Sequence, residues 1–90
     1  MPRPLKELKV PAHEKLTPEL AFAIVLRENR LRLGLDQAAL EDEGMDRSYV
    51  SKLELGERQV ALRGIFTIAK NLGMEPWALI REVAAKMQDT

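Results

Sequence analysis

Four glycines divide this sequence into short segments with helical patterns. They are Gly34, Gly44, Gly56 and Gly73. Glycine commonly ends a helix because it adopts the left-handed conformation without strain. Three segments also begin after a residue whose side-chain oxygen can cap a helix N-terminus, and these are Thr17, Asp36 and Asp46. The chain is therefore limited to short helices that must bury their apolar sides against one another.

The spacing of apolar residues predicts an all-α fold of five helices. Pro18 after Thr17 favours a helix start, and Glu75-Pro76 opens the last segment. No segment alternates convincingly with the period of a strand. The predicted helices cover about residues 17–33, 37–43, 47–55, 62–72 and 75–87.

Composition excludes several classes of function. The chain has 90 residues, enough for one domain, and contains no cysteine and one histidine, His13. Disulfides and thiolate chemistry are excluded, and a lone histidine cannot build a metal cluster. No nucleophile stands beside a base, and no glycine-rich phosphate loop is present. We predict no enzyme activity, no cofactor, no metal and no small-molecule substrate.

The ends and the apolar runs bear on location and organisation. The longest apolar run, Leu20 to Leu26, is too short to span a bilayer, and the first ten residues lack the apolar stretch of a signal peptide. We expect a soluble cytoplasmic protein with no membrane partner. Three prolines and mixed charges in residues 1–16 indicate a partly ordered arm, followed by one domain at 17–90.

Two short helices joined by a tight turn at Gly44 form the arrangement of a helix-turn-helix. In that motif the second helix enters the major groove of DNA and presents its N-terminal residues to the bases. The formal net charge of zero is unusual for a nucleic-acid-binding protein. The distribution is less even, since Arg27 to Arg32 is basic and Glu41 to Glu43 is acidic.

Three stretches in this order resemble the lambda-repressor-like, or XRE-type, helix-turn-helix family: RLGLDQAAL, GMDRSYVSKLELGER and IFTIAKNLGMEPWAL. The match runs from about Ala23 to Ile80. The resemblance implies a five-helix lambda-repressor-like bundle that binds double-stranded DNA with its third helix. It also implies a sequence-specific transcriptional regulator.

The resemblance assigns roles to individual residues. Those that match base-facing positions are Arg47, Ser48, Ser51 and Lys52. Those that match phosphate-contacting or mixed positions are Gln37, Tyr49 and Arg58. Arg30 and Glu54 match a salt bridge between the first and third helices, while Val50 and Leu53 match buried positions.

One departure from the family lies between Gln37 and Gly44, where the spacing is one residue shorter than usual. Depending on the direction of counting, Glu41 or Glu43 replaces a small or apolar residue. We expect the helix at 37–43 to end early or to rotate, which makes the phosphate contact of Gln37 the least secure assignment.

The last helix predicts a dimer. Its apolar stripe is wider than one packed edge requires and suggests an interface made by Trp77, Leu79, Ile80, Val83 and Met87. A homodimer would bind a palindromic operator. The alternative is a stripe buried wholly inside one domain.

A second class of function stays open. A lambda-repressor-like fold can serve as a protein–protein interaction module or as an antitoxin, and the acidic block at Glu41 to Glu43 is compatible with either. The arm could cover the first helix, extend the dimer contact or reach a DNA groove.

Overall fold

The computed structural model describes residues 16–88, so nearly all of the predicted arm, with His13, lies outside the described residues. Within this range the chain forms four α-helices and one short 3-10 helix, without a strand. They are α1 (Pro18–Arg32), η1 (Gln37–Leu40), α2 (Arg47–Glu54), α3 (Leu62–Leu72) and α4 (Pro76–Gln88). None of the helices described here is long and apolar enough to cross a membrane.

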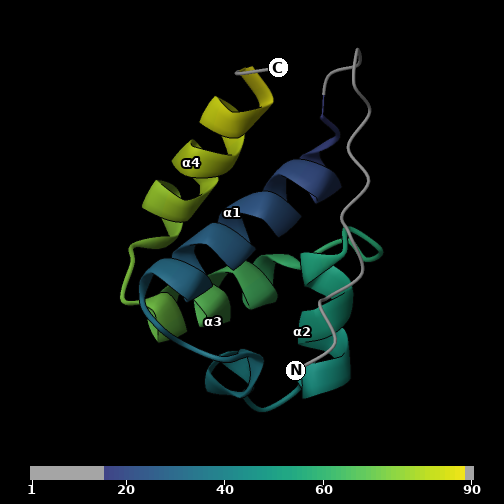
Figure 1. Cartoon of the computed structure of the whole chain (residues 1–90), viewed down its shortest axis with the longest axis vertical. Helices are drawn as coiled ribbons and strands as arrows, with labels where there is room; N and C mark the ends of the chain where they lie inside the picture. Colours follow the sequence, from purple (N-terminus) through teal and green to yellow (C-terminus); the bar gives the residue numbers. More distant parts are fainter. Residues whose placement is uncertain (1–15, 89–90) are drawn as a thin grey trace.

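Helix α1 lies at the centre of the fold. It runs between α4 on one side and α2 on the other, with α3 and η1 completing the bundle (Figure 1). The core is apolar, and every element contributes to it. Its largest fully buried apolar side chains are Val25, Leu26, Leu40, Val50, Leu53, Ile68 and Leu79.

The helix ends follow the local sequence signals. The side chain of Thr17 accepts a hydrogen bond from Leu20 N at 3.2 Å, and Asp46 accepts one from Tyr49 N at 2.8 Å. Asp36 caps η1 in the same way. At the other end of a helix, Gly73 has φ of 71°, the left-handed conformation that glycine favours. The caps predicted at Thr17, Asp36, Asp46 and Gly73 are confirmed, whereas Gly44 does not end a helix.

The second predicted helix is wrong in type and length. Instead of an α-helix over residues 37–43, the chain makes one 3-10 turn, Gln37–Leu40, and becomes extended at Glu41. Asp42 and Met45 then exchange two backbone hydrogen bonds, of 2.9 and 2.8 Å, across a tight turn with Gly44 at φ 82°. The six residues that separate η1 from α2, 41 to 46, therefore contain this turn instead of a second helical turn.

Because η1 ends at Leu40, the acidic residues that follow it stay out of the core. Glu41 and Glu43 are exposed, whereas Leu40 is fully buried. Asn71 on α3 approaches the carbonyl oxygen of Leu40 with its Nδ2 at 3.5 Å. The buried side chain of Leu40 therefore anchors the short η1 element in the core.

We predict that Leu40→Ala lowers the free energy of unfolding by about 3–5 kcal/mol, because it removes buried methyl groups and leaves a cavity. The matched control is Leu62→Ala, since Leu62 is 70% exposed and Leu40 is 0% exposed. That substitution should change stability by less than about 0.5 kcal/mol. Urea denaturation followed by circular dichroism measures both, and equal losses would contradict the anchoring role of Leu40.

Candidate functional site

Helix α2 has one buried side and one solvent-facing side. Val50 and Leu53 lie in the core, as predicted. Arg47 and Ser48 are exposed at the N-terminal end of the helix. Ser51 and Lys52 are half-buried beside them. Of the four residues predicted to face bases, two are therefore exposed at the start of the helix and two are partly covered.

The side of α2 next to the α2–α3 loop carries the residues predicted to make mixed contacts. Tyr49 is half-buried, and its hydroxyl lies 3.4 Å from the carbonyl oxygen of Gln59, to which it can donate. Arg58 in this loop is exposed. Tyr49 thus connects α2 to the loop that carries Arg58.

The carboxylate of Glu54, at the end of α2, is the buried centre of a polar network. Its side chain is 0% exposed. Arg30 on α1 donates from Nε to Oε2 at 2.5 Å and from Nη2 to Oε1 at 2.9 Å. This two-pronged geometry is the strongest form of an arginine–carboxylate pair. The Arg30–Glu54 pair therefore joins α1 directly to α2.

Arg27 adds a second guanidinium that sequence reasoning did not single out. Its Nη2 donates to the backbone oxygen of Glu54 at 3.1 Å, and its Nε lies 3.7 Å from Oε1 of the same residue. That Nε is buried and makes no hydrogen bond within the described residues. The available signal was spacing, since residues three apart on a helix share a face, as Arg27 and Arg30 do.

Gln37 is placed differently from what the resemblance implies. Its side chain is largely buried, and its Nε2 donates to Oε1 of Glu54 at 3.2 Å. The amide is thus directed into the protein rather than toward a phosphate outside it. Through Gln37, η1 joins the network that already connects α1 and α2.

The residues of α4 that were predicted to form a dimer interface do not all lie on its exposed side. Leu79 is fully buried in the core, so its assignment to a subunit interface is corrected. Trp77 and Ile80 are exposed by 58% and 48%, and Val83 and Met87 are half-buried. Because Leu79 faces inward, the exposed side of α4 is narrower than the apolar pattern alone indicates.

Two polar contacts hold α4 against α1. Asn29 is buried and donates from Nδ2 to Glu82 Oε1 at 2.8 Å. One helical turn further along α4, Lys86 Nζ lies 3.1 Å from Glu28 Oε2. These two polar contacts, together with apolar packing, therefore fix the position of α4 on α1.

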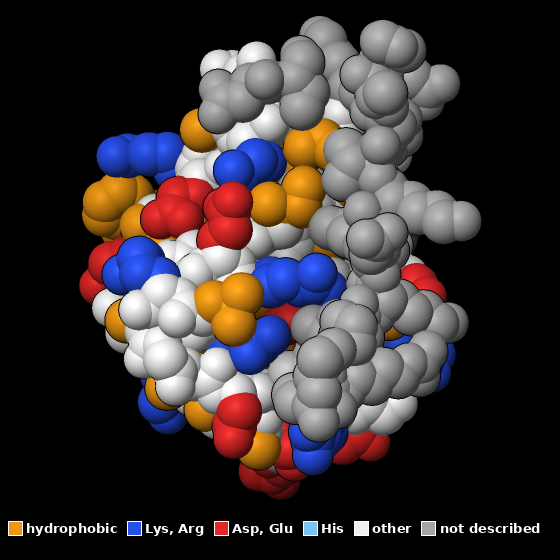
Figure 2. All heavy atoms as spheres, in the orientation of Figure 1, with side chains coloured by type: hydrophobic (Ala, Val, Ile, Leu, Met, Phe, Trp, Pro, Cys, Tyr) orange, Lys and Arg blue, Asp and Glu red, His pale blue; other side chains and the backbone are white. Residues whose placement is uncertain are grey.

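Charges of both signs lie side by side on the surface. The face drawn in Figure 2 carries basic, acidic and hydrophobic side chains close together rather than one uniform basic area. Glu41, Asp42 and Glu43 are exposed in the turn that precedes α2. Among residues 16–88, no three potential ligands are grouped so that they could hold a metal ion.

This arrangement is that of a helix-turn-helix domain. A helix-turn-helix family model, HTH_3, matches residues 26–76, which is more than half of the chain. The protein belongs to this XRE-type family. No curated protein matches the chain significantly.

A solved structure is similar over most of the molecule. It is described as a hypothetical transcription factor, NHTF, from Neisseria. The two chains share 31% sequence identity with a TM-score of 0.62, over 81% of this chain and 87% of that chain. The likeness therefore extends beyond the two helices of the motif.

We predict that Glu54→Gln lowers the free energy of unfolding by about 3–5 kcal/mol, because it leaves the guanidinium of Arg30 buried without its counter-charge. Glu57→Gln is the matched control, since Glu57 is exposed three residues away and should change stability by less than about 0.5 kcal/mol. Thermal unfolding at neutral pH measures both variants. A Glu54→Gln protein as stable as the control would show that the network contributes nothing to folding.

Proposed function

We propose that this protein is a sequence-specific DNA-binding regulator of transcription. The observation that carries the proposal is α2 itself, which is fixed at its C-terminal end by the buried Glu54 network and exposes Arg47 and Ser48 at its N-terminal end. A reading helix needs this combination, because bases are recognised by side chains held in a defined position. The family membership and the transcription-factor neighbour support the same function.

The exposed side of α2 has the chemistry for base recognition. Arg47 and Lys52 can donate to O6 and N7 of guanine, and the hydroxyls of Ser48 and Ser51 can donate or accept. Tyr49 and Arg58 lie beside them and are proposed to contact phosphates, with the thymine methyl group as a further partner of Tyr49. Gln37 is proposed to support α2 through Glu54, and that bond uses one of the two N–H donors of its amide, so the other is the group it could offer to a phosphate.

A homodimer with a palindromic operator completes the proposal. A two-fold pair would place its reading helices about 34 Å apart, one turn of DNA. The exposed Trp77 and Ile80 on α4 supply apolar surface for the pairing. The dimer would regulate by occupying its operator, as a repressor that needs no enzymatic activity.

The alternative function, a protein-interaction module or antitoxin, is favoured by one observation. Glu41, Asp42 and Glu43 are exposed immediately before α2, where they would repel phosphates that approach that side of the motif. A partner protein with a basic surface would instead be attracted. The two functions differ in whether the cations of α2 are needed for binding.

Selection of bound sequences from a random duplex pool, at moderate salt, tests the proposed function. We expect one inverted-repeat motif with half-sites about one helical turn apart. Binding that is sensitive to salt but indifferent to sequence would leave α2 without a reading role. No binding at all would favour the protein-interaction module.

We predict that Lys52→Ala weakens binding to the selected motif by about 5- to 150-fold, the effect of about 1–3 kcal/mol expected for a lost base contact. Lys70→Ala is the matched control, since Lys70 is exposed near the end of α3 and belongs to no proposed contact. Fluorescence anisotropy with labelled duplex measures both. If the two variants lose affinity equally, Lys52 acts only through overall charge.

A further inference from the structure

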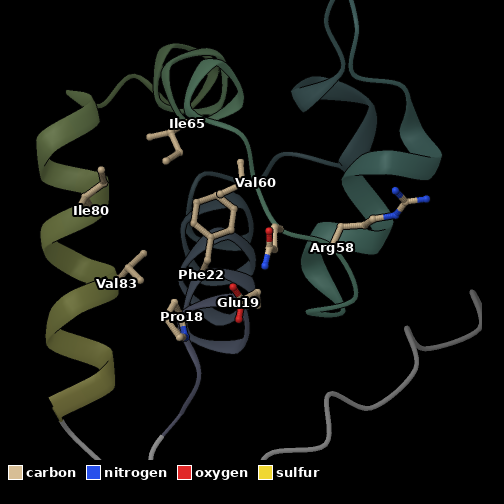
Figure 3. A pocket seen from close by; sticks show the side chains of 9 residues that line it. Pro18, Glu19, Phe22, Arg58, Val60, Ile65, Ile80 and Val83 are labelled. Carbon is tan, nitrogen blue, oxygen red and sulfur yellow. The ribbon is translucent and has the colours of Figure 1, made fainter.

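An apolar groove lies between the start of α1, the α2–α3 loop, α3 and α4. It encloses about 430 Å³, and Figure 3 shows the side chains that line it. Phe22 lies at its centre, with Ile80 and Val83 directed toward it from α4 and Ile65 from α3. Ile65 and Val83 are half-buried and Ile80 is 48% exposed. The described residues therefore leave this apolar surface partly in water, as is typical of a binding site.

The described part of the chain begins at the edge of this groove. Leu16 is 3% exposed, and the side chain of Thr17 caps α1. The next two residues, Pro18 and Glu19, line the groove itself, and Pro18 lies at one end of it (Figure 3). Residues 1–15 are therefore joined to the domain directly beside the groove.

The sequence of residues 1–15 has a period of three. Every third residue from the second to the eleventh is apolar, and these residues, the apolar row, are Pro2, Leu5, Leu8 and Pro11. The row that starts one residue later is basic except at Ala12, and its basic members are Arg3, Lys6, Lys9 and Lys15. A polyproline II segment has three residues per turn, and proline has the backbone angle that it requires. In that conformation the apolar row and the basic row would lie on different sides of the segment.

We propose that residues 2–11 dock in the groove of their own chain as a polyproline II segment, with Leu5 and Leu8 packed against Phe22. Segments of this conformation bind in grooves lined by aromatic side chains, because they are preformed and lose little entropy on binding. The apolar row then covers the exposed part of Ile80, and the basic row stays at the surface. The inference concerns how the chain covers its own apolar groove, and it does not depend on the proposed DNA binding.

Charge and covalent connection favour this segment over other occupants. Glu19 places a carboxylate in the groove lining, and Lys6 and Lys9 each follow one of the two leucines, so that either can approach it. The link between Pro11 and the described domain is residues 12–15, and four residues are enough for a turn back along the groove. A short link also gives an effective concentration on the order of millimolar, against which a separate partner would have to compete.

The first test measures proximity by NMR. The chain has no cysteine, so Lys9→Cys provides a single site for a nitroxide spin label, beside the apolar row and not in it. The methyl signals of Ile65 and Ile80, which line the groove, should lose more intensity than that of Ile24, the internal control, which does not line it. A loss at Ile24 as large as the loss at Ile80, or no loss at any of the three, would overturn the docking.

A mixed sample separates docking within one chain from docking on a second copy. Spin-labelled protein without ¹³C is mixed with an equal amount of unmodified protein whose isoleucine methyl groups carry ¹³C. The intensity loss at Ile65 and Ile80 should then disappear, because the label and the observed methyl groups are on different chains. A loss that persists in the mixture would assign the segment to the groove of another copy and overturn docking within the chain.

The second test measures thermal unfolding of the full chain by circular dichroism. Leu8→Asp should lower the midpoint by about 4–8 °C, the shift expected for loss of a modest apolar contact in a domain of this size. Val10→Asp is the matched control, since it adds the same charge two positions away but outside the apolar row, and it should leave the midpoint unchanged.

A double variant locates the contact. Ile80→Asp replaces a side chain that is 48% exposed, so the fold can tolerate it. In that background Leu8→Asp should lower the midpoint no further, because the surface that Leu8 covers is already lost. Equal shifts for Leu8→Asp and Val10→Asp, or an undiminished effect of Leu8→Asp beside Ile80→Asp, would overturn the inference.

Discussion

The buried carboxylate of Glu54 is the constraint on which the position of α2 depends. A carboxylate at 0% exposure is strongly disfavoured unless opposite charges and hydrogen-bond donors surround it. Arg30 satisfies both oxygens, and Gln37 adds a third donor. Because these donors come from α1 and η1, the helix that carries Glu54 can occupy only one position relative to both. The contacts at the C-terminal end of α2 thus fix the orientation of the polar side chains at its N-terminal end.

The short segment before α2 determines both the shape and the electrostatics of this part of the molecule. One 3-10 turn replaces a helix, and Leu40 and Gln37 supply the side-chain contacts that this short element makes with the core and with Glu54. The acidic residues fall in the following turn, where they are exposed. Their negative potential opposes non-specific attraction to phosphates. Binding by such a surface must depend more on base contacts and less on charge, which agrees with a net charge of zero.

Local signals predicted much of this structure, and contacts between distant residues account for the rest. The caps at Thr17 and Asp46 and the buried pair Val50 and Leu53 follow from rules that act within a few residues. The inward direction of Gln37 depends on Glu54, seventeen positions away, and no local pattern reports it. Leu79 shares the apolar stripe of α4 with Ile80, and only the packing of α4 on α1 decides which of them faces inward.

Helix α1 connects the two surfaces that the proposed DNA-binding dimer would use. Near its C-terminal end Asn29 bonds to Glu82 on α4, and the next residue, Arg30, bonds to Glu54 on α2. Adjacent residues of α1 therefore fix both α4 and α2. Because a helix is stiff over such a short distance, the offset between the two surfaces is nearly constant. In a two-fold dimer that offset determines the separation of the two reading helices, and hence the spacing of half-sites that the protein can bind.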